Sequence, residues 1–254
     1  MSDIKTSIKI CLILLSGTLA YSCSVSNYKL VRANRSAYQM NQNAEVDSTI
    51  IKTYTPYKIK LEEEMNQVIG HADVLMSKVD TVPENLLRNF FSDACLAQAL
   101  KIDPEIDLAM PSTKGGIRID VPKGPIRLTN IFELMPFENE LIVYKLKGSD
   151  VQNLLEFIAD TGGQPIAGFS MKIKEGKPAD VIIKGKPFDP GRSYWVLTSD
   201  YIAGGGDRVE SFKNPLEKKM LNLRVRAALI GYVKENEAAG KSIKPILDGR
   251  IIKN

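Results

Sequence analysis

The apolar pattern of this chain changes irregularly between a helical and a strand period, and this mixture restricts the folds it can adopt. The segment PENLLRNFFSDACLAQALKID has apolar residues at helical spacing and Pro83 near its start, which predicts an amphipathic helix. Further helices are expected near residues 129–134, from Ser149 as a cap, and at about 216–234. Strands are expected at 106–110, 140–147, 168–173, 179–183, 194–202 and 246–252. Helices mixed with non-adjacent strands indicate one α+β domain.

The region ahead of that helix has a different character. Residues 24–45 are polar and rich in Asn and Ser, so they predict a tether with a short strand at 28–33. Asp47 and Ser48 can cap a helix that Pro56 should kink. The stretch EEEMNQVIGHADVLM then shifts to period two, which predicts a strand with Val68 on its apolar face and His71 on the other.

The N-terminus predicts an export signal. Lys5 and Lys9 precede a short apolar run, and the stretch is too short to span a bilayer. Its AYSC end resembles the lipobox of bacterial lipoproteins, which implies that Cys23 is lipidated and becomes the new N-terminus; ordinary secretion with nearby cleavage is the alternative. The next residues, SVSNYKL, contain no acid, which favours a periplasm-facing anchor in a Gram-negative cell envelope. We expect a signal at 1–22, a tether at 23–45 and a domain at 46–254.

Composition argues against several classes of function. A net charge of +4 gives no footprint for a nucleic-acid partner. The chain has one histidine, His71, whereas a zinc or dinuclear metal site normally needs several. A Ser-His-Asp hydrolase would have to use His71, and no G-x-S-x-G motif is present. Cys95 lies among apolar residues and predicts a buried, inert thiol. We therefore expect no catalytic residue, metal ligand or cofactor in this chain.

Three short stretches are suited to a ligand. KGGIR combines glycines that permit close backbone approach with Arg118, whose planar donors suit phosphate, although a plain turn is the alternative. LMPFENEL places the aromatic Phe137 between a proline and a charged segment. YIAGGGDRVESF carries Tyr201 and Asp207 on either side of a bare loop centred on Gly205. A nucleoside needs such groups, because its base stacks on a ring and its ribose diol donates to a carboxylate.

Together these stretches resemble the C-terminal, substrate-binding domain of the 5'-nucleotidase / UDP-sugar hydrolase family. The matching motifs are TKGGIR, PFEN with the following KGSDVQNLLE, and YIAGGGD, in the family's order. The resemblance implies a single domain of mixed sheets flanked by helices, layered α/β/β/α. It also implies that Phe137 and Tyr201 sandwich the base, that Asp207 takes the ribose hydroxyls, and that Arg118 meets phosphate.

The chain departs from the family on the phosphate side. Thr113 stands for the family's loop asparagine, Lys114 for a glycine and Arg88 for a helix glycine. The family's additional phosphate-contacting arginine would fall near Pro83, which cannot replace it. Lys114 or Arg88 is a candidate to compensate. The signatures of the family's metallophosphoesterase domain, Asp-x-His and Gly-Asn-His, are absent from this sequence.

These observations leave three readings. The first is the nucleotide-recognition half of a split 5'-nucleotidase, with divalent metals held by a separately encoded metallophosphatase. The second is an envelope lipoprotein that binds a nucleotide or nucleoside without catalysis. The third is a degenerate domain kept as a structural envelope protein, against which the intact Asp207 and the two aromatics argue.

Overall fold

A computed structural model describes residues 29–30, 32–37 and 47–253. The predicted signal at 1–22, Cys23 and most of the tether lie outside these residues. Of the predicted strand at 28–33, the described residues 29, 30, 32 and 33 form neither helix nor strand. The chain divides into the units Met1–Ile51 and Lys52–Asn254. Within the described ranges, no helix combines the length and the apolar character needed to cross a membrane.

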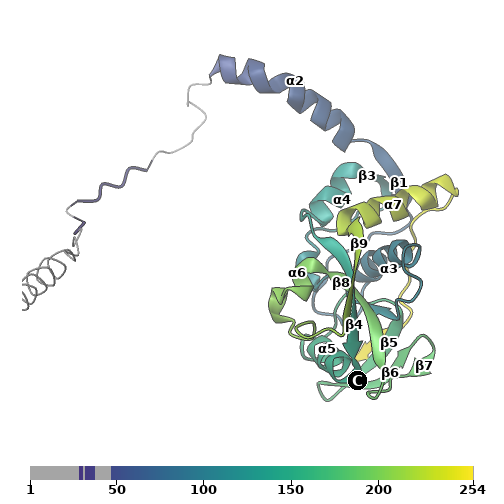
Figure 1. Ribbon diagram of the computed structural model, residues 1–254. Helices are drawn as coiled ribbons and strands as arrows, with labels where there is room; N and C mark the ends of the chain where they lie inside the picture. The colour runs from purple at the N-terminus through teal and green to yellow at the C-terminus, as the bar shows by residue number, and fades with distance from the viewer. Residues whose placement is uncertain (1–28, 31, 38–46, 254) are drawn as a thin grey trace, which may run out of the picture. The chain divides into compact units, whose positions relative to one another are not determined.

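The sheet at the centre of Figure 1 has the strand order β2 (Leu108–Ala109), β8 (Ser193–Ser199), β4 (Glu140–Lys147) and β9 (Glu217–Arg224). Strand β4 runs antiparallel to both of its neighbours, and β2 runs parallel to β8. In β8, Leu197 belongs to one hydrophobic cluster and its neighbour Val196 to another. Because successive side chains of a strand point to opposite faces, both faces of this sheet are covered.

The remaining strands form two further sheets. One has the order β10 (Ile251–Lys253), β5 (Phe169–Lys174), β6 (Lys177–Ile183) and β7 (Lys186–Pro187), with β10 parallel to β5. The other pairs β1 (Val68–Ala72) with β3 (Gly124–Arg127) in antiparallel orientation. The sheets of the described chain are thus mixed, as expected for an α+β domain.

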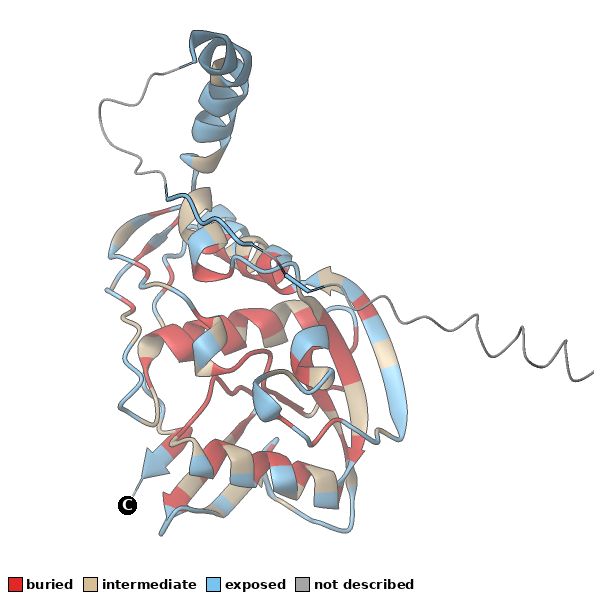
Figure 2. Cartoon of the chain, turned by 90° about the vertical axis from the view of Figure 1, so that its left-hand side faces the viewer, coloured by how far each residue is buried: buried red, intermediate tan, exposed pale blue. Residues whose placement is uncertain are grey.

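Helices cover the sheets. They are α3 (Leu86–Leu100), α4 (Leu128–Leu134), α5 (Gly148–Asp160), α6 (Asp200–Ala203) and α7 (Val225–Ala238). Residues of α3, α4 and α7 share one hydrophobic cluster, and residues of α5 and β5 share the other. Figure 2 shows the buried residues gathered on the strands and on the helix sides that face them. The predicted fold class is confirmed.

Several sequence predictions are wrong in detail. Residues 217–224 form strand β9 and not the start of the last helix, because Leu221 packs into the core while β9 pairs with β4. The strand predicted to reach residue 202 ends at Ser199, whose side chain caps α6. Helix α5 begins at Gly148, so Ser149 lies inside its first turn and is not the cap. The strand predicted from residue 246 begins only at Ile251.

The region before α3 also differs in part. Helix α2 (Ser48–Met65) runs through Pro56 to Met65, and none of its described side chains is buried. Strand β1 begins at Val68, which is exposed because a register shift separates it from Gly70. His71 is exposed, as predicted, and its Nδ1 lies 3.1 Å from Oε2 of Glu237.

Cys95 is buried in α3, as the sequence predicts. Desolvation raises the pKa of its thiol well above the ordinary range. A buried thiol that stays protonated is a poor nucleophile.

Candidate functional site

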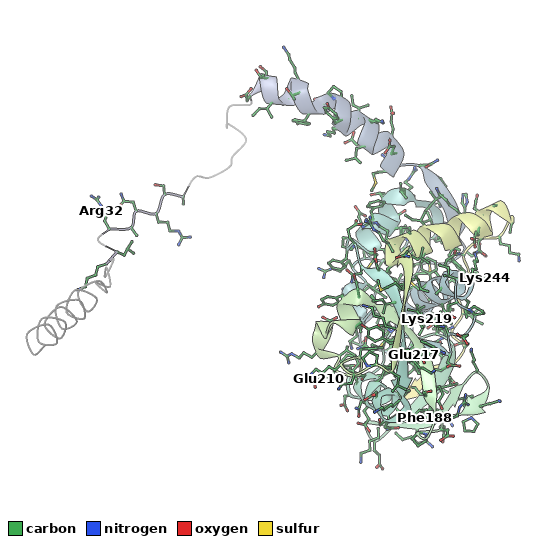
Figure 3. All side chains as sticks on the ribbon, in the orientation of Figure 1. Arg32, Phe188, Glu210, Glu217, Lys219 and Lys244 are labelled. Atoms are coloured by element: carbon green, nitrogen blue, oxygen red, sulfur yellow. The ribbon has the colours of Figure 1, made fainter. Side chains whose placement is uncertain are left out.

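A cavity of about 220 Å³ brings the three ligand-suited stretches together. Its lining includes Gly115, Arg118, Phe137, Asn139, Tyr201 and Asp207. These residues come from three segments separated by many residues in the sequence. Figure 1 shows α6, which carries Tyr201, beside strands β4 and β8, and these contacts hold its loop against the sheet. Glu210, labelled in Figure 3, marks the loop beyond α6.

Arg118 and Phe137 form one side of the cavity. Arg118 follows the short helix η1 (Lys114–Gly116), and its backbone N–H donates to the carbonyl of Leu134 at 3.0 Å, which ties this loop to α4. Phe137 lies in the turn between α4 and β4 and is 39% exposed. The guanidinium carbon of Arg118 is 5.9 Å from the centroid of the Phe137 ring. A guanidinium at this distance from a ring is within the range of a cation–π contact.

Tyr201 lies on α6 and is half exposed, and its ring packs against the backbone of Gly206. A Cβ added to Gly206 would lie only 2.5 Å from Cε1 of the Tyr201 ring. The ring can therefore rest against the loop only because residue 206 has no side chain. One face of the ring is against the loop, and its 50% exposure leaves room for a stacked group.

Gly205 has a different reason to be glycine. Its φ is 88°, in the left-handed region that glycine adopts without strain. A Cβ added there would meet no described heavy atom within 4 Å, and Gly205 is not among the described lining residues. The structure thus brings Arg118, Phe137, Tyr201 and Asp207 together, and it does not place the predicted site residue Gly205 in the cavity lining.

Asp207 sits beyond these glycines with φ 51° and ψ 24°, a conformation uncommon for a residue with a side chain. Its Oδ1 accepts a hydrogen bond of 3.0 Å from the hydroxyl of Tyr201, and its Oδ2 accepts one from Oγ1 of Thr113. The hydrogen bond to Asp207 and the charge of its carboxylate raise the pKa of the Tyr201 hydroxyl. Asp207 itself is exposed to solvent, so its carboxylate can still accept from a ligand.

The two candidates for compensating phosphate contacts do not reach this cavity. Arg88 is 2% exposed and donates to the carbonyls of Val82 and Gly163, and burial lowers its pKa. The Lys114 ammonium donates to the carbonyl of Thr161 at 2.8 Å, and Lys114 lines a neighbouring depression. Of these cations, only Arg118 is in the described cavity lining.

Sequence reasoning named Phe137 but missed Asn139, two residues later, which also lines the cavity. The signal was available, because both residues lie in the quoted PFEN stretch. Ser112 and Met135 line the cavity as well; Met135 lies in the quoted LMPFENEL stretch, whereas Ser112 lies outside the quoted stretches.

The described residues hold no group of three or more His, Cys, Asp or Glu side chains arranged to bind a metal ion. The described residues therefore do not fit the ligand requirement of a dinuclear metal centre.

A family model described as 5'-nucleotidase, C-terminal domain, matches residues 68–214, which is more than half of the chain. Protein UshA of Escherichia coli is 30% identical over 175 residues, which cover 66% of this chain and 30% of UshA. The NAD 5'-nucleotidase of Haemophilus influenzae is 28% identical over 199 residues, which cover 68% of this chain and 32% of that protein. The chain thus spans about a third of the length of these curated relatives.

The fold is shared with a solved protein. The 5'-nucleotidase precursor from Thermus thermophilus superposes with a TM-score of 0.67 at 25% identity, over 80% of this chain and 42% of that one. Less than half of the solved chain is therefore matched.

Proposed function

This chain belongs to the 5'-nucleotidase C-terminal domain family, and we propose that it is the nucleotide-recognition half of a split 5'-nucleotidase. The single observation that carries the proposal is the cavity in which Arg118, Phe137, Tyr201 and Asp207 meet. In this function the chain binds the base and the ribose, while a separately encoded metallophosphatase supplies the metals and hydrolyses the phosphate ester.

Each side chain suits one part of a nucleotide. The exposed rings of Phe137 and Tyr201 offer stacking surfaces for a base, worth about 1–3 kcal/mol per base. The Asp207 carboxylate can accept from the ribose hydroxyls through charge-assisted hydrogen bonds. Arg118 provides a planar cation for the phosphate, next to Phe137.

The metals belong to the partner in this proposal. The described residues offer no group of metal-binding side chains for them, and the match of this chain covers only 30% of the length of UshA. In the split enzyme the partner's metals would supply the hydrolytic chemistry, and this chain would hold the nucleotide through its base and its ribose.

A second candidate, an envelope protein that binds a nucleotide or nucleoside without catalysis, is favoured by one observation. Arg88 and Lys114 donate to backbone carbonyls and do not line the cavity. Of the three candidate cations, Arg118 alone is then left to contact a phosphate in the described lining. This candidate predicts that AMP and adenosine bind about equally well. The split enzyme predicts that AMP binds more tightly, through Arg118.

We also propose that the chain is lipid-anchored through Cys23 in a Gram-negative cell envelope, facing the periplasm. The support is the AYSC end of the predicted signal and the absence of acids directly after it.

Calorimetric titration with adenosine, AMP and inorganic phosphate tests the proposed function. Adenosine and AMP should bind to the full-length chain in mild detergent, and phosphate alone should bind weakly. Absence of heat with both nucleosidic ligands would refute the proposal, whatever the phosphate result.

A further inference from the structure

We propose that Thr113 is a positioning residue for Asp207 and that it gives the site a preference for ribose over deoxyribose. This inference rests on the proposed function, since it assumes that Asp207 receives the sugar hydroxyls. It adds to that function the class of sugar and a residue that selects it.

The side-chain hydroxyl of Thr113 is hydrogen-bonded to Asp207. The side chain is 4% exposed, and Thr113 occupies the N-cap position of η1 without making a capping hydrogen bond to any described residue. Its Oγ1 donates instead to Oδ2 of Asp207, 94 residues away in the sequence. A buried hydroxyl needs a partner, and here that partner is the carboxylate of the site.

The Asp207 carboxylate is consequently held from two directions. Its backbone lies in the left-handed region, which fixes where the side chain starts. The Tyr201 hydroxyl holds Oδ1 at 3.0 Å, and Thr113 holds Oδ2. Donors on separate segments of the fold thus fix the rotation of the carboxylate plane.

This arrangement leaves a defined acceptor pattern for a ligand. An ionised carboxylate has about four lone-pair sites, two on each oxygen. Thr113 and Tyr201 occupy one site on each oxygen, which leaves one free site on each. A ribose offers two neighbouring hydroxyl donors to those two sites, a 2'-deoxyribose offers one, and a 2',3'-dideoxyribose offers none. Thr113 should therefore matter only for ligands that carry the hydroxyls.

The test compares Thr113→Val, which keeps the shape and removes the hydroxyl, with Thr113→Ser, which keeps the hydroxyl. Adenosine, 2'-deoxyadenosine and 2',3'-dideoxyadenosine are titrated into the full-length wild type and both variants. Thr113→Val should weaken adenosine binding by about tenfold and dideoxyadenosine binding by less than about twofold. Thr113→Ser should restore adenosine binding to within about threefold of the wild type.

Equal losses for adenosine and dideoxyadenosine would overturn the inference, because Thr113 would then only support the loop. A Thr113→Ser variant as weak as Thr113→Val would overturn it as well. These failures are distinct from a failure of the proposed function, which would show as a wild type that binds no adenosine. Unchanged dideoxyadenosine binding also shows that the Thr113→Val variant is folded.

Discussion

Gly206→Ala should displace the Tyr201 ring with little effect on the stability of the loop, so it tests the contribution of the ring position to binding. The added Cβ would lie 2.5 Å from Cε1 and 2.6 Å from Cδ1 and Cζ of Tyr201, so the ring must move. The ring is half exposed and can turn away, and the φ of Gly206 is not in the positive range, so the cost to folding should be small. The cost should fall on binding, because the stacking surface is displaced.

The magnitude follows from the stacking energy. Loss of about 1–3 kcal/mol corresponds to roughly a 5- to 100-fold increase in the Kd of adenosine. The matched control is Gly205→Ala, whose φ of 88° strains the backbone of alanine by about 1–2 kcal/mol without placing a Cβ near the ring.

Calorimetry and thermal unfolding of both variants make the comparison. Gly206→Ala should lose more affinity, and Gly205→Ala should lower the unfolding temperature more. Wild-type affinity in Gly206→Ala would refute the view that the bare loop positions Tyr201 for stacking.

Three further outcomes are expected. Tyr201→Ala should weaken adenosine binding by about ten- to a hundredfold. Tyr201→Phe keeps the ring but loses the hydrogen bond to Asp207, so it should raise the Kd of adenosine only about a few fold. Equal losses of affinity by calorimetry would assign the effect to the hydroxyl and not to the ring. Detergent phase partitioning should move Cys23→Ala into the aqueous phase while the wild type stays with detergent, and the lipoprotein interpretation fails if both variants partition alike. The purified chain should release no phosphate from AMP with added Mg²⁺, Mn²⁺ or Zn²⁺, and metal-dependent release that co-purifies with the wild type would contradict the split-enzyme proposal.

Local sequence patterns were sufficient to predict several of the helices and strands. Strand β4 was predicted at its observed bounds, and the amphipathic pattern located α3 correctly, because in both segments the apolar spacing and the final burial agree. Strand β9 was missed because Glu217, Lys218 and Lys219 are common in helices, whereas pairing with β4 decides the conformation of this edge segment. Figure 3 shows Glu217 and Lys219 on this segment. Lys219 forms ion pairs with Asp103 and Glu105, contacts that no local pattern encodes.

In the candidate site too, local motifs predicted some features, while others depend on contacts that form only in the folded chain. Arg118, Phe137, Tyr201 and Asp207 could be named from short motifs, since each lies in a stretch with unusual local chemistry. Gly205 is required by its left-handed φ angle, and Gly206 is required by the position of the Tyr201 ring. Both properties belong to the folded chain, so the sequence could not distinguish the roles of the two glycines.

The hydrogen bond from Thr113 to Asp207 joins segments 94 residues apart, so it appears only in the folded chain. The same holds for the burial of Arg88, which the sequence had left as a candidate phosphate ligand.

The most direct test of the central claim is the affinity of adenosine for Asp207→Ala and Asp207→Asn beside the wild type. Asp207→Ala removes a charge-assisted hydrogen-bond acceptor worth about 1.5–3 kcal/mol, so the Kd should rise by roughly ten- to a hundredfold. Asp207→Asn keeps the shape and loses the charge, and it should fall between the other two. Circular dichroism should show the same fold for all three proteins. If adenosine binds the wild type and Asp207→Ala with the same affinity, the carboxylate does not receive the ribose, and nucleotide recognition in this cavity is contradicted.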